Sequence, residues 1–306
     1  MEKFDLIVIG GSAAATSAGI YAARRNLNFK IITKEFGGEV ATSGEIGNWP
    51  GISKTDGVAL AAQFKKHLKS YCVEPEEGVE AEKIVVQPDG SFLVESKAGN
   101  YKAKTIIITT GVHPRELGVP GEKEFRNKGV SYCTVCDGPL FAGKTVATVG
   151  GGNSVLESAL MLSDIAKKVY VINKNPQFKG DRILIDNLAQ KENVQIIYNV
   201  LAKEIVGSEF VSGLKYKPED SPQELEIKVD GVFVHVGMVP NSGLVPENVE
   251  KNQFGEIVVN QNCETNIPGL YAAGDVTNVP HKQIVIAAGM GATALLSAVN
   301  CLNRLK

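Results

Sequence analysis

An α/β fold built from two related halves is predicted by three observations. The first is a buried apolar strand that breaks into a turn of small residues and then a helix, at residues 4–25. The second is the recurrence of this strand–turn–helix order at residues 145–163. The third is a later apolar strand ending in glycine in each copy, at 105–111 and at 231–237. Together they predict two Rossmann-like domains in one chain.

The turn of each copy suits a pyrophosphate group. The first turn is Gly10-Gly11-Ser12-Ala13-Ala14-Ala15, and the second is Gly150-Gly151-Gly152-Asn153-Ser154. Small residues let the backbone approach a pyrophosphate, while the free amides and the positive end of the following helix receive its charge. One glycine-rich turn is often an ordinary tight loop. Two turns in the same context predict two dinucleotide-binding sites.

Prolines mark the points at which the chain passes from one half to the other. Pro114 follows the terminal strand of the first copy and Pro240 that of the second, so extended crossover segments are expected there. The C-terminal segment holds two short strands and one long helix, too little for a domain of its own. We therefore expect a discontinuous first domain at 1–114 and 246–306, with a second domain inserted at 115–245.

A small insertion is also expected within the first domain. Residues 81–86 and 91–95 alternate between apolar and polar side chains, and Pro88-Asp89-Gly90 joins them. This pattern predicts an antiparallel hairpin.

Composition and charge narrow the function. The 306 residues are 43% hydrophobic, which is enough for two ordinary cores. The formal net charge is −2 with both signs interspersed, so we expect no basic surface for nucleic acid. We recognise no signal peptide, and no apolar run is expected to approach the length of a membrane span. The sequence thus predicts a cytoplasmic protein that binds neither nucleic acid nor membrane.

A pair of cysteines with an acidic neighbour indicates redox chemistry. Cys133 and Cys136 stand two residues apart, and Asp137 follows. Two thiols at this spacing can close a disulfide, and the carboxyl group can handle the proton that reduction requires. Half of a zinc site is the alternative, but the other cysteines stand singly and no histidine has the spacing of a zinc module. Because cytoplasmic thiols are kept reduced, a working redox couple is favoured and no metal site is expected.

The order and spacing of five motifs resemble the low-molecular-weight thioredoxin reductases of bacteria and archaea, which are class II flavoprotein disulfide reductases. The motifs lie at residues 44–51, 109–115, 133–138, 150–154 and 269–276, and the resemblance covers nearly the whole chain. It implies that the first domain binds FAD and that the inserted domain carries the cysteine pair and binds a nicotinamide cofactor, NADPH or NADH. It also implies that the active unit is a homodimer.

The resemblance further implies a reaction and a role for each residue of the redox pair. The chain is expected to be a flavin-dependent dithiol–disulfide oxidoreductase that reduces thioredoxin or a thioredoxin-like protein. Cys136 is expected to face the flavin and receive its electrons, and Cys133 to attack the substrate disulfide. Asp137 is expected to act as the acid–base group. The inserted domain is expected to swivel between two poses.

Cofactor contacts are likewise implied by the resemblance. The first turn should hold the pyrophosphate of FAD, Asn48 should lie beside the flavin, and Asp275 should bind the ribityl chain unless it is only a helix cap. The second turn should hold the nicotinamide cofactor. The expected FAD set is Gly10, Ser12, Ala13, Ala14, Thr33, Lys34, Glu35, Gly38, Glu39, Asn48, Thr110, Gly111, Asp275, Lys282, Gln283 and Ile284, and the nicotinamide set is Gly150, Gly152, Asn153 and Ser154.

Two departures from the family pattern stand out. Ser12 stands where glycine is usual and the backbone should approach the pyrophosphate most closely, although a small serine can still allow binding. Residues 173–179 contain no arginine to clamp the 2′-phosphate of NADPH, which leaves the electron donor open. Lysines attract a phosphate without the bidentate fork, and Asn173 is not the acid that selects NADH. Ferredoxin or a deazaflavin are therefore alternative donors. A flavin oxidase, a peroxiredoxin-reducing enzyme and a non-catalytic flavin redox sensor are alternative functions.

Several conspicuous single residues are expected to have structural roles. Trp49 is expected to contribute buried area, and His235 to be a core histidine with satisfied hydrogen bonds. The single cysteines Cys72, Cys263 and Cys301 are expected to be small buried hydrophobic residues.

Overall fold

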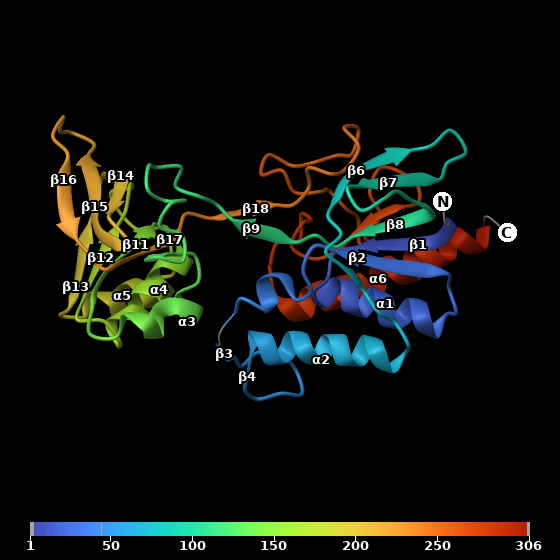
Figure 1. Cartoon of the computed structure of the whole chain (residues 1–306), viewed down its shortest axis with the longest axis horizontal. Coiled ribbons are helices and arrows are strands. Elements are labelled where there is room, and N and C mark those ends of the chain that lie inside the picture. Colours follow the sequence, from blue (N-terminus) through green and yellow to red (C-terminus); the bar gives the residue numbers. More distant parts are fainter. Residues whose placement is uncertain (1–2, 44, 305–306) are drawn as a thin grey trace. The chain divides into compact units, whose positions relative to one another are not determined.

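The computed structural model describes residues 3–43 and 45–304, and for Glu45 and Cys136 it describes the backbone alone. Gly44, the first residue of one predicted motif, lies outside the described residues. The chain folds into an α/β structure in which parallel strand pairing predominates (Figure 1). The predicted fold class is confirmed.

The chain divides into two compact units. Unit 2 is Pro114–Met238, drawn in green to gold in Figure 1, and unit 1 is formed by the residues on either side of it. Residues 239–245, which the sequence analysis assigned to the inserted domain, belong to unit 1. The reason is that Leu244 and Val245 are buried in the core of unit 1.

A seven-stranded sheet forms the centre of unit 1. Its strand order is β5-β2-β1-β8-β7-β6, and β19 pairs with β8. The pairs β1–β2, β1–β8 and β8–β19 are parallel, whereas β6 and β7 form the predicted antiparallel hairpin. The bounds are β1 Lys3–Ile9, β2 Phe29–Thr33, β5 Glu76–Glu77, β6 Ala81–Val86, β7 Phe92–Ser96, β8 Tyr101–Ile108 and β19 Leu270–Ala272; a further pair is formed by β3 Glu45–Ile46 and β4 Thr55–Asp56.

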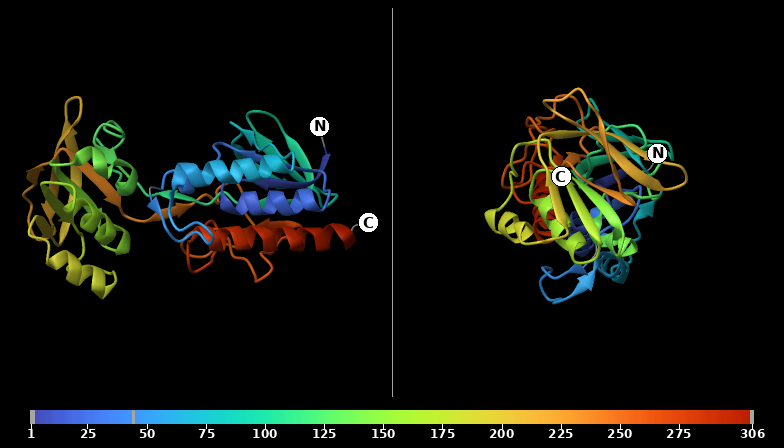
Figure 2. Two further views of the ribbon diagram at one scale, coloured as in Figure 1. Left: turned by 90° about the horizontal axis from the view of Figure 1, so that it is seen from below. Right: turned by 90° about the vertical axis from the view of Figure 1, so that its left-hand side faces the viewer.

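Three helices lie side by side on one face of this sheet (Figures 1 and 2). They are α1 Ala13–Arg24, α2 Gly57–Ser70 and α6 Ile284–Arg304, and a short 3₁₀ helix η1 covers Gly38–Val40. Helix α6 touches α1 so closely that a Cβ on Gly291 would lie 2.1 Å from the carbonyl oxygen of Ala14. This contact holds the C-terminal segment against the helix that follows the first glycine-rich turn.

Helix α6 corrects one expectation from the sequence. Its 21 residues have a mean hydropathy of 1.8 in the most apolar window, so by length and composition the helix could cross a membrane. The expectation that no apolar run approaches that length is therefore wrong. The apolar residues that are buried, among them Leu295 and Val299, face the core of unit 1, whereas Val285 and Leu296 are exposed. A core helix of a soluble protein passes the same test of length and composition.

A five-stranded parallel sheet forms the centre of unit 2, with the order β10-β17-β11-β12-β13. Helices α4 and α5 belong to this unit, and a three-stranded antiparallel sheet β14-β15-β16 extends it. The bounds are β10 Val130–Ser131, β11 Thr145–Gly150, β12 Lys168–Ile172, β13 Val194–Ile197, β14 Val200–Gly207, β15 Val211–Pro218, β16 Leu225–Lys228, β17 Gly231–His235, α3 Thr134–Asp137, η2 Gly138–Phe141, α4 Asn153–Ser163 and α5 Arg182–Ala189.

The chain leaves unit 1 within strand β9 and returns to it within strand β18. Strand β9 covers Val112–Pro114, β18 covers Met238–Pro240, and the two pair with each other. The extended crossover segments predicted around Pro114 and Pro240 therefore take the form of a two-stranded ribbon.

Candidate functional site

The first glycine-rich turn requires glycine for steric reasons. Gly10 has a φ of +129°, and a Cβ there would lie 2.3 Å from the carbonyl oxygen of Thr109. A Cβ on Gly11 would lie 2.6 Å from Oγ1 of Thr33. The turn therefore packs tightly against the ends of β8 and β2. Helix α1 begins directly after it, and no side chain caps the amides of its first turn.

Ser12, the departure from the family pattern, is used in a structural contact. Its hydroxyl donates a 2.6 Å hydrogen bond to the carbonyl oxygen of Gly37, and the amide of Gly37 donates a 2.7 Å bond to the carbonyl oxygen of Gly11. These two bonds join the turn to the loop that carries Gly38 and Glu39. The Ser12 side chain thus holds this loop against the glycine-rich turn and does not obstruct the turn.

The predicted residues at the end of β2 have contrasting surroundings. Thr33 is buried, and its hydroxyl donates a 2.7 Å hydrogen bond to the carbonyl oxygen of Glu35. Lys34 is exposed and forms an ion pair with Glu80 at 3.1 Å. Desolvation raises the pKa of Glu39 although much of this residue is exposed. Among these residues, Thr33 and the loop that follows it lie next to the first glycine-rich turn.

The C-terminal segment brings Asp275 beside the same turn. Gly274 lies against Ala14, since a Cβ on it would be 3.5 Å from the Cβ of Ala14. The Oδ1 atom of Asp275 is buried and has no hydrogen-bond partner among the residues that the structure describes. Burial raises the pKa of Asp275, and Lys282 opposes this shift. Because α6 begins only at Ile284, Asp275 is not the cap of that helix.

Just before the start of α6, Lys282 is held by two polar contacts and Gln283 meets Asn48. Lys282 Nζ pairs with Glu256 Oε1 at 2.8 Å and donates to the carbonyl oxygen of Thr277 at 2.5 Å. Asn48 Nδ2 donates a 3.1 Å hydrogen bond to Gln283 Oε1, across 235 positions of sequence. The structure therefore gathers Asn48 and Gln283 as the sequence analysis expected of two residues of one site.

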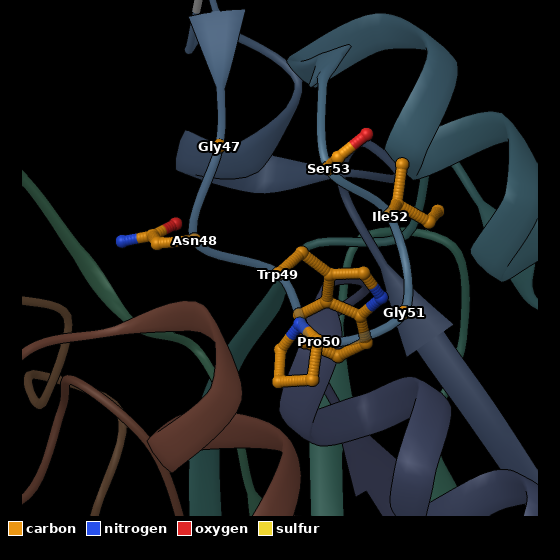
Figure 3. A pocket seen from close by; sticks show the side chains of 7 residues that line it. All are labelled: Gly47, Asn48, Trp49, Pro50, Gly51, Ile52 and Ser53. Atoms are coloured by element: carbon orange, nitrogen blue, oxygen red, sulfur yellow. The ribbon is translucent and has the colours of Figure 1, made fainter.

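The loop that carries Asn48 surrounds an open pocket of about 530 Å³ lined by residues 47–53 (Figure 3). The Trp49 ring packs edge-on against Phe64 with the ring centroids 5.3 Å apart, which is the packing role expected of it. In Figure 3 the Asn48 side chain points away from Trp49. The Asn48 amide thus reaches the residue just before α6 through its bond to Gln283.

Thr110 and Gly111 are held by a residue that the sequence analysis did not single out. Asn241 donates from Nδ2 to the carbonyl oxygen of Thr110 at 2.8 Å, and its own carbonyl oxygen accepts from Thr110 Oγ1 at 2.7 Å. Its Oδ1 atom lies 2.6 Å from Nδ1 of His113. Asn241 fixes the end of the first crossover, and only its place after Pro240 could have hinted at this role.

The second glycine-rich turn is equally crowded on one side and open on the other. Gly150 has a φ of +155°, and a Cβ there would lie 2.2 Å from the carbonyl oxygen of His235. Apart from its chain neighbours, no atom of the described residues lies within 4 Å of a Cβ built on Gly152, which is also the N-cap of α4 and so offers that helix no side-chain cap. Asn153 is engaged with Asp181 through two hydrogen bonds of 2.9 Å and 2.7 Å. Of the predicted set, Gly150 and Gly152 therefore shape the turn, Ser154 follows on α4, and Asn153 braces the turn against the start of α5.

Residues 173–179 form a turn beside Gly151 that carries two lysines and no arginine. Asn173 is fully buried, and its Oδ1 accepts hydrogen bonds from the amide of Asn175 at 2.9 Å and from Asn175 Nδ2 at 3.2 Å. The Nδ2 atom of Asn173 is buried and finds no hydrogen-bond partner within the described part of the chain. Lys174 and Lys179 are exposed. Instead of the arginine side chains that would clamp a 2′-phosphate, this turn holds the buried side-chain amide donor of Asn173.

The cysteine pair flanks and enters the four-residue helix α3 of unit 2. Cys133 is disulfide-bonded and immediately precedes α3, whereas the side chain of Cys136 lies outside the part of the chain that the structure describes. Ser131, which the sequence analysis missed, accepts a 3.0 Å hydrogen bond from the Cys133 amide and donates a 2.6 Å bond to Asp137 Oδ2. Val135 and Leu140 are exposed beside the pair. The structure thus brings together a disulfide sulfur, a carboxylate and an apolar surface.

The single cysteines differ from one another. Cys72, Cys263 and Cys301 are all free. Cys263 is buried and burial raises its pKa to about 11, which suits an inert thiol. Cys72 is exposed, with a φ of +57° in the turn that ends α2, so the expectation that it is buried is wrong. Its position is set by the helix end rather than by its apolar character.

Comparison with known proteins shows which family and which relatives this chain resembles. Residues 4–291 match the family model described as pyridine nucleotide-disulphide oxidoreductase. Over 306 residues the chain is 42% identical to an NADH dehydrogenase of Ferdinandcohnia aciditolerans and 41% identical to a component of the alkyl hydroperoxide reductase of Pseudomonas putida. These alignments cover 99% of this chain but 58% and 59% of the two relatives, so the chain spans about three fifths of the length of the curated relatives it matches.

Solved structures match over the full length. The thioredoxin reductase of Lactococcus lactis has a TM-score of 0.87 at 29% identity, covering 98% of this chain and 99% of that one. The thioredoxin reductase of T. acidophilum has a TM-score of 0.84 at 37% identity with both chains fully covered. A ferredoxin-flavin thioredoxin reductase of Clostridium acetobutylicum has a TM-score of 0.56 at 30% identity, covering 100% of this chain and 99% of that one. The chain therefore belongs to the pyridine nucleotide-disulphide oxidoreductase family and has the fold of the low-molecular-weight thioredoxin reductases.

Proposed function

We propose that the protein is a flavin-dependent dithiol–disulfide oxidoreductase with Cys133 and Cys136 as its redox couple and a thioredoxin-like protein as its substrate. The observation that carries the proposal is the disulfide-bonded Cys133 one helical turn from Asp137, in a chain of this family. Two uncapped glycine-rich turns, one in each unit, support the binding of two dinucleotides. The proposed active unit is a cytoplasmic homodimer.

The residues of unit 1 fit an FAD molecule. The first turn presents free amides to a pyrophosphate, and the unpartnered buried oxygen of Asp275 suits the hydroxyl groups of a ribityl chain. Asn48 and Gln283 would meet the ring with amide donors and acceptors. When bound, FAD would supply the two electrons that disulfide reduction needs.

The residues of unit 2 would handle the disulfide chemistry. Reduction breaks the Cys133–Cys136 bond and adds two electrons and two protons, and Asp137 is placed to give or take a proton at a neighbouring thiol. The Cys133 thiolate then attacks a disulfide of the substrate and forms a mixed disulfide. Attack by Cys136 on Cys133 restores the protein disulfide and releases the substrate with two thiols. The exposed Val135 and Leu140 would form part of the docking surface.

A second candidate partner is favoured by the relatives. The alkyl hydroperoxide reductase component of Pseudomonas putida is 41% identical, which supports a protein of a hydroperoxide-reducing system as the disulfide substrate. This chain spans only 59% of that relative, so the parts that choose the relative's partner need not be shared. The same cysteine pair would act in both cases, and the partner protein distinguishes them.

The electron donor is proposed to be NADH or a donor other than NADPH. The exposed Lys174 and Lys179 offer no bidentate grip on a 2′-phosphate, and Asn173 is neutral. The relative named NADH dehydrogenase supports NADH, and the ferredoxin-flavin thioredoxin reductase of similar fold supports ferredoxin. NADPH remains a weaker donor in this proposal.

The test is turnover of the FAD-loaded chain under anaerobic conditions. Thioredoxin and a peroxiredoxin would be supplied in their disulfide forms, with NADH, NADPH and reduced ferredoxin as parallel donors. The proposal expects thiols to appear on one of the two proteins with the wild type, and none with Cys133→Ser or Cys136→Ser. A wild-type protein that reduces neither protein under anaerobic conditions, and oxidises the donors only after oxygen is admitted, would contradict the proposal and favour a flavin oxidase.

A further inference from the structure

A buried chain of hydroxyl groups lies directly behind the cysteine pair. Thr134 stands between Cys133 and Cys136 and is only 5% exposed. Its Oγ1 atom lies 2.6 Å from Ser158 Oγ and 2.8 Å from His235 Nε2. The chain thus begins inside the redox motif and runs into the core of unit 2.

The hydroxyl chain continues beyond Thr134. Ser158 Oγ lies 3.1 Å from Thr148 Oγ1, and the latter residue is fully buried. The four members come from four elements: Thr134 from α3, Ser158 from α4, Thr148 from β11 and His235 from β17. All of these elements belong to unit 2. We call these four residues the Thr134 network.

Every member of the Thr134 network has a defined hydrogen-bonding role. A neutral imidazole carries one donor and one acceptor, so His235 can accept from Thr134, which then accepts from Ser158 and Ser158 from Thr148. The reverse direction, with Nε2–H donating, satisfies the same contacts. Burial lowers the pKa of His235 to about 4, so the network is uncharged at neutral pH. The expected role of His235 as a core histidine with a satisfied ring nitrogen is confirmed at Nε2.

Helix α3 depends on such contacts for its position. It has four residues, and a helix this short has no stability of its own. The Thr134 side chain points its only polar atom into the core, so the first residue of α3 is anchored to α4 and β17. On the other side, Ser131 holds both the Cys133 amide and Asp137. The backbone that carries the two cysteines is therefore fixed from both sides.

We infer that Thr134, Ser158 and His235 are positioning residues that set the redox equilibrium of the Cys133–Cys136 couple by holding α3 in the geometry that a disulfide requires. The inference rests on the proposed function only in taking these two cysteines as the redox couple. A pre-organised backbone raises the effective concentration of one thiol for the other and so favours the disulfide. When the anchor is lost, α3 gains freedom and the dithiol form becomes relatively more populated.

The test measures this equilibrium directly in the full chain with its flavin. Protein is equilibrated anaerobically in buffers of reduced and oxidised dithiothreitol, quenched by alkylation, and the peptide containing both cysteines is weighed. Each dithiothreitol that becomes a cyclic disulfide gives two electrons and two protons to the pair, whose S–S bond breaks into two thiols. The readout reports the cysteines alone and does not depend on donor, substrate or turnover.

The informative variants are Thr134→Val, which keeps the shape of the side chain, and Ser158→Ala. Each is expected to shift the equilibrium constant about tenfold toward the dithiol, which corresponds to about 30 mV for a two-electron couple. Ser158→Thr, which keeps the hydroxyl group, is expected to stay within about twofold of the wild type, as is His235→Gln, which keeps a donor and an acceptor.

Ser163→Ala is the matched control. Ser163 lies on the same helix α4, is 9% exposed and donates its hydroxyl to the carbonyl oxygen of Leu160 at 2.6 Å. Its removal also deletes a buried hydroxyl group but is expected to leave the equilibrium within about twofold of the wild type. Thermal unfolding of all variants shows whether the two alanine variants lose similar stability. A redox shift that Ser158→Ala shows and Ser163→Ala does not show supports positioning.

Three outcomes would overturn the inference, and they separate it from the proposed function. If the wild-type pair titrates but Thr134→Val and Ser158→Ala match it, or if Ser163→Ala shifts it equally, the Thr134 network does not set the equilibrium and the proposed function stands. If Ser158→Ala fails to fold, the Thr134→Val and Ser158→Thr pair decides in the same way. If the wild-type pair takes no electrons in any buffer, both the proposed function and the inference fail.

Discussion

Ser131 donates a 2.6 Å hydrogen bond to Asp137 across the turn that carries the disulfide-bonded Cys133. The same hydroxyl oxygen accepts from the Cys133 amide at 3.0 Å, so one buried side chain holds both the sulfur-bearing residue and the proposed acid–base group. A carboxylate on a four-residue helix would otherwise sample several rotamers. The serine therefore fixes where the proton of the reaction can be given or taken.

Ser131→Ala is expected to lower kcat/KM for the disulfide substrate about fivefold, because a positioned hydrogen bond is worth about 1 kcal/mol. Asp137→Asn is expected to lower it about a hundredfold, since it removes the acid–base group itself. Steady-state kinetics with the reduced donor in excess measures both. Ser212→Ala, which removes an exposed hydroxyl of unit 2 that bonds only weakly to Val206, is the control. Full activity in Ser131→Ala would show that Asp137 needs no such support.

FAD retention is expected to depend on the geometry of the first turn. Gly10→Ala should abolish it, because the new Cβ would lie 2.3 Å from the carbonyl oxygen of Thr109 at a φ of +129°. Gly99→Ala imposes a similar backbone strain at a φ of +141°, but with no atom within 4 Å, and should retain the flavin. The flavin released per chain on denaturation gives the ratio. A colourless wild type that takes up no FAD would contradict the cofactor assignment.

Acid stability is expected to report on His235. Burial lowers its pKa from 6.5 to about 4, so between these values the unfolded chain binds the proton and the folded chain does not. The stability that His235 contributes is therefore complete above pH 6.5 and is lost as the pH falls toward 4. The loss is at most about 3 kcal/mol.

Urea unfolding at several values of pH measures this dependence. His235→Gln should show a shallower loss of unfolding free energy between pH 6.5 and 4 than the wild type, because glutamine does not titrate. His281→Gln, at an exposed site of unit 1, should leave the slope unchanged. Equal slopes in the wild type and His235→Gln would mean that the buried ring is not the source of the acid sensitivity.

Donor preference is expected to be weak in the wild type. Exposed charge pairs are worth about 0–1 kcal/mol, so the exposed Lys174 and Lys179 should give NADPH little advantage over NADH. The triple variant Lys174→Arg, Asn175→Arg and Lys179→Arg should raise NADPH use selectively, because arginine grips a phosphate with two parallel hydrogen bonds. Rates of flavin reduction by NADPH and NADH give the ratio. A wild type with strong, salt-resistant NADPH selectivity would show that other residues supply the clamp.

The sequence predicted those parts of the fold that depend on local pattern. Apolar periodicity, glycine and proline predicted the two strand–turn–helix units, the hairpin β6–β7 and the crossovers near Pro114 and Pro240. Apolar patterning did not reveal that α6 has the composition of a membrane span, because small and weakly polar residues interrupt its apolar run.

The supports of the site could not be predicted in the same way. Thr134 meets His235 across 101 positions, and Asn241 meets Thr110 across 131. The residues of such a pair become neighbours only once the order of the strands within the sheet is known. Serine, threonine and asparagine also occur in ordinary loops, so their spacing in the sequence does not mark a site. Ser131 lies only six positions before Asp137, but the sequence does not show that the Ser131 hydroxyl points toward Asp137. That direction depends on the conformation of the turn before α3.

The central claim is that one chain holds two redox centres, FAD and the Cys133–Cys136 disulfide, and that they exchange electrons. Anaerobic titration of the FAD-loaded protein with dithionite, followed by the flavin spectrum, counts the electrons that each chain accepts. The account predicts about four electrons for the wild type and about two for Cys133→Ser, since each centre takes a pair. A wild type that is fully reduced by about two electrons per chain would show that the disulfide does not communicate with the flavin, and would contradict the account.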